Sequence, residues 1–258
     1  MKLQVLGCAG GIGGRERFTT CLWLDHDVLL DAGTGLSSLD VEQLAAIDHI
    51  FLSHCHLDHV AGLALLLDAI NGKRSTPIVV HATDEVIASL KKHLFNWVLW
   101  PDFTTIPSEE NPIFRWEPMS PGSTIELDGR FITSHTVNHT EGSVGYWVRS
   151  RELPDQGFLF TGDMATTPDL WDTLASGGNL SKVIVDCSFP NAESALADLS
   201  RHFCPESLLR EISGLPQSIE FLIYHLKPGQ EELIMDELRA AGGSRVLNAI
   251  KRGDTFLF

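Results

Sequence analysis

The 258-residue sequence has no apolar run long enough to cross a membrane, which takes roughly 18 consecutive apolar residues. Its N-terminus, Met1–Leu6, runs directly into glycines and lacks the long apolar region of a signal peptide. We therefore expect a soluble, cytoplasmic protein with no membrane partner.

Cysteine is scarce, and no pair has the Cys-x-x-Cys spacing. The odd number of five cysteines argues against a disulfide framework, and their spacing argues against a structural zinc knuckle. We expect each of them to be a small, buried hydrophobic residue: Cys8, Cys21, Cys55, Cys187 and Cys204.

Basic residues are also few, with 19 Lys and Arg against 34 Asp and Glu, for a formal net charge of −15. Stable binding to nucleic acid needs Lys and Arg to displace counterions, so the charge disfavours it. A small anionic substrate remains compatible with this charge, because bound metal ions can reverse the local field.

The chain has no internal repeat, low-complexity tract or linker, so we expect one domain over residues 1–258. Two β-rich blocks are each followed by helices, which predicts an α+β fold with two sheets face to face and helices outside, a four-layered αββα sandwich. The first block comprises strands at 2–6, 21–24, 28–30 and 48–52, then a helix at 60–70, a strand at 78–81 and a helix at 84–96 that Thr83 caps. The second comprises strands at 123–127, 130–136, 143–149 and 158–161, followed by strands at 182–186, 219–224 and 245–248 and helices at 192–203, 205–213 and 231–241.

The strongest chemical signal is His54-Cys55-His56-Leu57-Asp58-His59, directly after the apolar strand Ile50–Leu52. A strand end followed by a tight turn can aim several side chains at one point. Imidazole nitrogens with a carboxylate suit an ion such as Zn²⁺. The alternative is an incidental or pH-responsive histidine patch.

Further candidate ligands stand at other strand ends: His139, Asp163 in Gly162-Asp163, and His225. Each alone is more often structural, and only the joint pattern predicts a second ion. His135 competes with His139 for the same position, and we prefer His139 because His139–Tyr146 resembles the His-x3-Ser-x-Gly-Tyr run of a known hydrolase family.

The pattern His-x-His-x-Asp-His, a lone His, Gly-Asp and a lone His resembles the metallo-β-lactamase superfamily over nearly the whole chain. The resemblance implies that fold, with two divalent ions: Zn²⁺ is the preferred ion, and Mn²⁺ and Fe stay open. It further implies that His54, His56 and His139 bind one ion, that Asp58, His59 and His225 bind the other, and that Asp163 bridges them. Asp31, in the similar Leu29–Gly33 motif, would orient a ligand by a hydrogen bond. Taken alone, Asp31 could equally be a turn residue.

Several segments are similar to class II cyclic-nucleotide phosphodiesterases: His56–Gly62, Trp100–Phe103, Asp186–Pro190, Arg201–Pro205 and Tyr224–Pro228. The sequence departs from that family at Leu67-Asp68, and at Arg201 and Cys204, which replace Gly and Thr. The resemblance implies an enzyme that hydrolyses 3′,5′-cyclic nucleotides, cAMP or cGMP, to 5′-monophosphates by a metal-bridging hydroxide.

Asp58 and His202 are the expected catalytic residues. His202 is similar to a histidine that, in tRNA 3′-processing endonucleases, pairs with the aspartate of the His-x-His-x-Asp-His motif, and it is the candidate general acid. The alternative is that His202 satisfies carbonyls at a helix end. Trp100 and Phe103 could form a stacking wall for a base, or belong to the core. Ser143, in the His139–Tyr146 run, is also assigned to substrate binding.

The glycine run Gly7–Gly14 fits neither a dinucleotide nor a phosphate loop, and we expect a flexible hairpin bordering the site. Other functions stay open: tRNA 3′-processing, thioester or lactone hydrolysis on the same fold, or a ligand-binding protein on this scaffold. The expected partner is a small phosphodiester, with a homodimer as an open assembly state.

Overall fold

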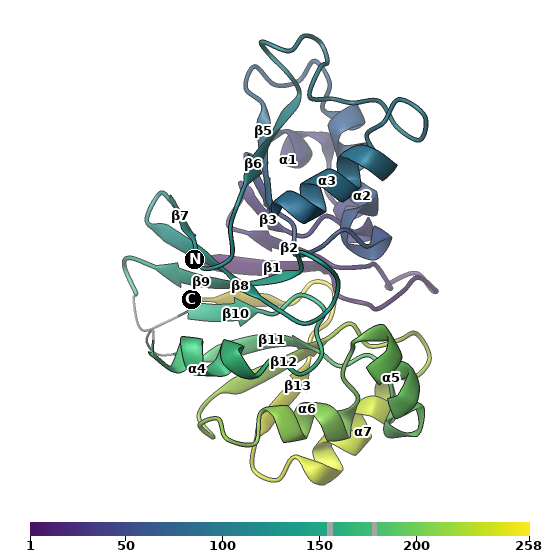
Figure 1. Cartoon of the computed structure of the whole chain (residues 1–258), viewed down its shortest axis with the longest axis vertical. Coiled ribbons are helices and arrows are strands. Elements are labelled where there is room, and N and C mark those ends of the chain that lie inside the picture. The colour runs from purple at the N-terminus through teal and green to yellow at the C-terminus, as the bar shows by residue number, and fades with distance from the viewer. Residues whose placement is uncertain (154–156, 177–179) are drawn as a thin grey trace.

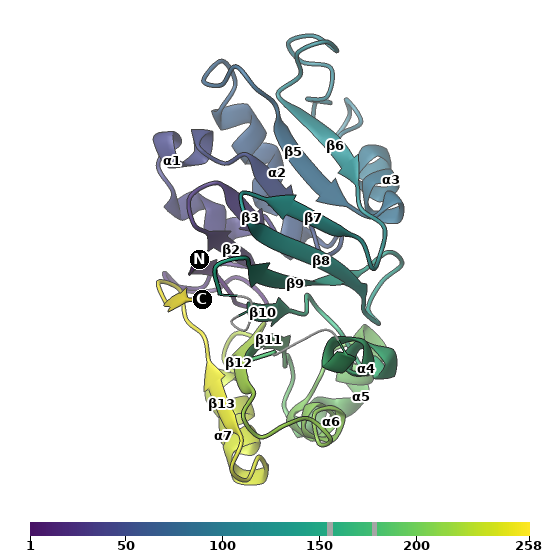
Figure 2. The same cartoon turned by 90° about the vertical axis from the view of Figure 1, so that its left-hand side faces the viewer.

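The computed structural model describes residues 1–153, 157–176 and 180–258, with side chains in the helix at 168–176 described up to residue 173. Within this part of the chain, two seven-stranded sheets pack face to face, and helices cover both outer faces (Figures 1 and 2). The predicted four-layered αββα sandwich is confirmed. No helix of the described residues is both long and apolar enough to cross a membrane.

The first sheet has the strand order β14-β1-β2-β3-β4-β5-β6, and helices α1 to α3 lie on its outer face. Strands β3 to β6 are parallel to one another. The strand bounds are β1 Lys2–Gly7, β2 Cys21–Leu24, β3 Val28–Leu30, β4 His49–Phe51, β5 Ile78–Ala82, β6 Phe114–Pro118 and β14 Thr255–Leu257; the helices are α1 Val41–Ala45, α2 Leu57–Ala69 and α3 Asp84–His93, with a 3-10 helix at Thr34–Ser38.

The second sheet has the order β13-β12-β11-β10-β9-β8-β7, and its strands β10 to β13 are parallel. Helices α4 to α7 lie on its outer face (Figure 1). The strand bounds are β7 Thr124–Leu127, β8 Arg130–Thr136, β9 Val144–Ser150, β10 Gly157–Phe160, β11 Lys182–Asp186, β12 Glu220–Tyr224 and β13 Val246–Ala249; the helices are α4 Pro168–Ser176, α5 Ser194–Ser200, α6 Pro205–Glu211 and α7 Glu231–Ala241, with a 3-10 helix at Asn191–Glu193.

Three apolar layers hold the sandwich together. The middle layer lies between the sheets and includes Phe51 and Leu22 from the first and Tyr146 and Phe160 from the second. A layer on each outer face joins a sheet to its helices. Because both faces of the central strands are buried, strands such as β11 and β12 read as continuous apolar runs.

Parallel strands place their carboxyl ends at one edge of a sheet, and this rule assembles the functional side chains. In the first sheet, β3 is followed by Asp31, and β4 is followed by a loop with His54 and His56 and then by the first turn of α2 with Asp58 and His59. In the second sheet, β10 is followed by Gly162-Asp163 and β12 by His225. The two edges face each other across the sandwich.

The sequence-based elements differ from the structure at a few points. The helix expected at 84–96 is capped by Thr83 as predicted but ends at His93. Strand β6 falls in the stretch 101–121, for which no element was predicted, because proline obscured its pattern. As an edge strand, β6 tolerates Pro118 at its end. The short elements α1, α4 and β14 were also missed.

Candidate metal centre

Asp31 organises the loop that carries the histidine motif. Its carboxylate accepts hydrogen bonds from the backbone N–H and the hydroxyl of Ser53, each at 2.7 Å. It also lies 2.7 Å from Nδ1 of His59. Since the carboxylate can only accept, Nδ1 of His59 carries a proton, and Nε2 is the ring nitrogen that faces the site.

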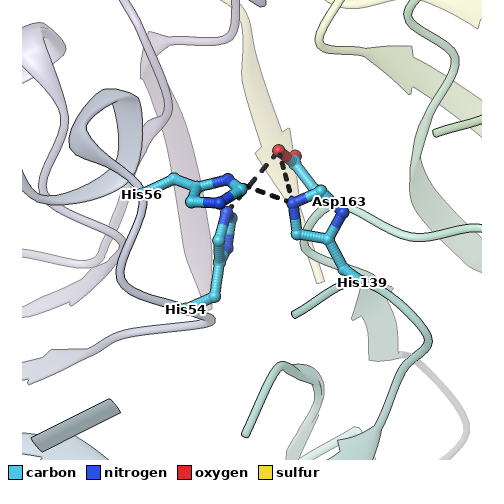
Figure 3. A group of neighbouring side chains, drawn as sticks. All are labelled: His54, His56, His139 and Asp163. Carbon is cyan, nitrogen blue, oxygen red and sulfur yellow. Dashed lines mark hydrogen bonds and ion pairs between the residues drawn. The ribbon is translucent and has the colours of Figure 1, made fainter. Parts of the chain in front are cut away.

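His54, His56, His139 and Asp163 form a first cluster, which contains one ligand atom from each residue within 4.8 Å of the others. Figure 3 shows the side chains converging from two sides, His54 and His56 from the loop after β4 and His139 from the loop after β8. Nε2 of His139 lies 3.1 Å from Nδ1 of His56 and 3.9 Å from Oδ2 of Asp163.

Asp58, His59, Asp163 and His225 form a second cluster of the same kind. Nε2 of His225 lies 3.0 Å from Oδ2 of Asp58 and 3.2 Å from Oδ2 of Asp163. Nε2 of His59 lies 3.2 Å from that same Asp163 oxygen. Asp163 therefore belongs to both clusters, and the Tyr224 hydroxyl holds its other oxygen at 2.9 Å.

The donor atoms fit divalent cations. Nε2 of His54 and Nε2 of His59 are buried and make no hydrogen bond within the described residues. A buried polar nitrogen without a partner is costly, and a cation at each cluster would satisfy it. Neutral imidazoles combined with carboxylates are donors that Zn²⁺, Mn²⁺ and Fe accept.

Burial keeps the ligands of the first cluster in the form that binds cations. It lowers the pKa of His54 well below the ordinary value, with His59 adding to the effect, and it lowers the pKa of His139 to about 4. Both imidazoles are therefore neutral near pH 7. The carboxylates of Asp163 and Asp31 outweigh the burial of His59 and raise its pKa, while His225 and His59 outweigh the burial of Asp163 and lower its pKa.

A third group of polar side chains, Asp186, Ser188 and His202, contacts His225 of the second cluster. Nδ1 of His202 lies 2.7 Å from Oδ2 of Asp186, and the Ser188 hydroxyl donates to Oδ1 of Asp186 at 2.6 Å. The carboxylate of Asp186 outweighs the burial of His202 and raises the His202 pKa. The His202 ring stacks on His225 with centroids 5.0 Å apart and lies 4.9 Å from the ring of His139. His202 therefore borders both clusters, and its carboxylate partner is Asp186 rather than Asp58.

The glycine run borders the site, as expected. The backbone N–H of His225 donates to the carbonyl of Cys8, and that of Gly10 donates to Leu226. His225 has a left-handed φ of 62°. A Cβ on Gly10 would lie 2.2 Å from the His225 carbonyl oxygen, so only glycine fits there.

His135, the competitor of His139, stays outside both clusters. It lies on β8 with its ring 6.3 Å from that of Trp147. The structure therefore brings His139 to the site and not His135.

The predicted substrate residues Trp100, Phe103 and Ser143 all make structural contacts, and their role in substrate binding stays a prediction. Phe103 is 3% exposed within the outer core of the first sheet. Trp100 packs against the same core, and its Nε1 donates to the carbonyl of Ala64. Ser143 is buried, and its hydroxyl accepts from the backbone N–H of Thr140 and closes the turn after His139.

Sequence reasoning gave no role to Asp186, Ser188 or Tyr224, although it quoted the segments that contain them. Asp186 ends a strand between β10 and β12, which carry Asp163 and His225, so the strand-end rule could have found it. Ser188 had no comparable signal, because its role depends on the path of the chain after β11.

A family model described as the beta-lactamase superfamily domain matches residues 26–241. The chain belongs to the beta-lactamase superfamily. The matched region includes strands of both sheets and every residue of the two clusters, in agreement with the predicted resemblance.

The chain is also similar to proteins named as cyclic-nucleotide phosphodiesterases. The chain is 27% identical over 250 residues to a 3′,5′-cyclic-nucleotide phosphodiesterase of Schizosaccharomyces pombe, covering 82% of this chain and 69% of the relative. It is 28% identical over 225 residues to a probable 3′,5′-cyclic-nucleotide phosphodiesterase of Yersinia pestis, covering 75% of this chain and 63% of the relative. The structure of unliganded yeast PDE1 superimposes with a TM-score of 0.84 at 18% identity, covering 100% of this chain and 99% of that one, and so shares the fold.

Proposed function

We propose that this protein is a dimetal phosphodiesterase that hydrolyses 3′,5′-cyclic nucleotides to 5′-monophosphates. The observation that carries the proposal is the pair of donor clusters sharing Asp163, with His202 bordering both. The similarity to relatives named cyclic-nucleotide phosphodiesterases favours this substrate class over other electrophiles. The proposed substrate is a small, anionic phosphodiester.

His54, His56 and His139 would hold one ion, Asp58, His59 and His225 the other, and Asp163 both. Two divalent cations supply Lewis acidity and positive charge, which neutralise the phosphodiester in its transition state. We propose Zn²⁺ as the ion, because imidazole nitrogen and carboxylate oxygen are its usual ligands. Asp31, through His59, and Ser188, through His225, would keep the ring nitrogens of the ligands correctly oriented.

His202 would act as the general acid. Its Nδ1–H is donated to Asp186, which leaves Nε2 to carry the second proton of the imidazolium. The ribose 3′-oxygen is a poor leaving group, so protonation by Nε2 as the P–O3′ bond breaks would accelerate the reaction about 10²–10⁴-fold. The carboxylate of Asp186 stabilises the imidazolium before the proton leaves.

The test is the hydrolysis of cAMP and cGMP by the metal-loaded protein, with the 5′-monophosphate identified by chromatography. His139→Ala should abolish turnover, because the first cluster loses a ligand. His135→Ala is the matched control, since His135 lies on β8 and outside both clusters, and it should retain turnover.

Absence of turnover with cAMP, cGMP and bis(p-nitrophenyl) phosphate by a protein that holds its metals would overturn the proposal. Cleavage of precursor tRNA without cyclic-nucleotide turnover would assign the site to tRNA processing instead. The organisation of residues 1–258 as one domain, a homodimer and a cytoplasmic location stay predictions.

A further inference from the structure

Arg201 makes a reciprocal contact with the metal-ligand candidate His139. Its guanidinium Nη1 donates to the backbone carbonyl of His139 at 2.6 Å. Its own backbone carbonyl lies 3.0 Å from Nδ1 of the His139 ring. One residue on the second sheet's helical layer thus holds both the backbone and the side chain of His139.

The second of these contacts fixes the tautomer of His139. A carbonyl oxygen only accepts hydrogen bonds, so Nδ1 must carry the proton. Nε2 then presents its lone pair to the first cluster, where Nδ1 of His56 lies 3.1 Å away. Any residue at position 201 supplies this carbonyl, provided the backbone stays in place.

The contact between Nη1 of Arg201 and the His139 carbonyl depends on the arginine side chain. The backbone of Arg201 is strained. Arg201 ends α5 in the left-handed conformation, with φ 55° and ψ 52°. Glycine adopts this region freely, whereas a residue with a Cβ is strained there. The strain is not needed to end the helix, because glycine would end it equally well.

The positive charge of Arg201 does not by itself favour cation binding at the first cluster. A guanidinium beside a cation site repels the cation and would lower its affinity if charge were the whole effect. Arg201 is exposed, and no ion pair within the described residues offsets its charge. A benefit of the arginine to the site therefore has to come from geometry.

We propose that Arg201 is a positioning residue that holds His139, by these two contacts, in the orientation needed to bind a cation at the first cluster. The proposal rests on the proposed metal site and is independent of the substrate. It predicts that affinity for the first ion depends on a side chain that never touches the ion.

The test compares Arg201→Gly with the wild-type protein by Zn²⁺ titration against a chromophoric chelator and by thermal melting of the metal-free protein. We expect affinity for one of the two ions to fall about 10–100-fold, the range found when a group supporting a ligand is removed. The metal-free Tm should not fall, because glycine relieves the left-handed strain. Arg201→Lys retains a donor and should keep more of the affinity than glycine does.

Asp128→Gly is the matched control, because Asp128 is an exposed residue with φ 47° in the β7–β8 turn. It relieves the same strain away from the site and should leave both affinities unchanged. Unchanged or increased affinity in Arg201→Gly would overturn the proposal, as would a fall in Tm that accounts for the loss. If the wild-type protein binds no Zn²⁺, the proposed function fails first, so the two failures are distinguishable.

Discussion

The hydroxyl of Ser188 lies 2.8 Å from Nδ1 of His225 and 2.6 Å from Oδ1 of Asp186. Its single proton goes to the carboxylate, so its oxygen accepts the Nδ1–H of His225. Nε2 of His225 is thereby left free to face Asp58 and Asp163. Ser188 thus links Asp186, the hydrogen-bond partner of His202, to His225 of the second cluster.

Ser188→Ala should weaken binding at the second cluster about 10–100-fold, because His225 loses the group that sets its tautomer. Zn²⁺ affinity measured by chelator competition tests this. Ser37→Ala is the control, since the Ser37 hydroxyl is exposed and bonds only within its own turn. Equal affinities in the two variants would show that the Ser188 contact does not orient His225.

His202→Ala should lower kcat for cAMP about 10²–10⁴-fold, because the 3′-alkoxide then leaves without a proton. The loss should be far smaller for bis(p-nitrophenyl) phosphate, whose leaving group is stable as an anion. Measuring kcat on both substrates separates proton donation from a general structural defect. Equal losses on both would remove His202 as the general acid.

Gly10→Ala should displace His225, since the new Cβ would lie 2.2 Å from the His225 carbonyl oxygen and 2.9 Å from its Nδ1. A displacement of about 1 Å at a catalytic site can cost 10²-fold in rate, and we expect a loss of this order. Steady-state kinetics of Gly10→Ala and Gly214→Ala provides the measurement. Gly214 has open space around it, so its variant should match the wild type.

Acid stability should depend on His81, which lies on β5 and belongs to neither metal cluster. Burial, with the nearby His49 and Arg115, lowers the pKa of His81 from 6.5 to about 3. Below its unfolded pKa of 6.5, the unfolded chain binds a proton that the folded protein does not. The free energy of unfolding should therefore fall as the pH drops from 6.5 towards 3, by at most about 1.4 kcal/mol per pH unit for this group.

Urea unfolding at several pH values checks this dependence. His81→Asn should show a shallower decline than the wild type, because the titrating group is gone. His26→Asn is the control, since the His26 side chain is 80% exposed. An identical decline in His81→Asn and the wild type would contradict the assignment.

The sequence predicted much of the fold, because strands buried on both faces and amphipathic helices leave clear periodic patterns. It also singled out the clustered ligands, since His54–His59 are adjacent in the chain and Asp163 and His225 end apolar strands. It left the role of Phe103 and Trp100 open, because their aromatic character suits a base and a core equally well. In the structure both side chains pack against the first sheet's outer core.

Contacts between distant segments were beyond sequence reasoning. Arg201 looked like a simple departure from a family pattern, and its contact with His139 depends on how the chain turns after α5. The pairing of His202 with Asp186, rather than with Asp58, likewise depends on the close approach of segments joined only by tertiary packing.

The most direct test of the account is the number of ions bound per chain after equilibrium dialysis against Zn²⁺ and elemental analysis. We predict two ions for the wild-type protein, one for His139→Ala, and weakened binding of both ions for Asp163→Ala. One ion or fewer in the wild type, or two tightly held ions in Asp163→Ala, would contradict two clusters joined by a shared carboxylate.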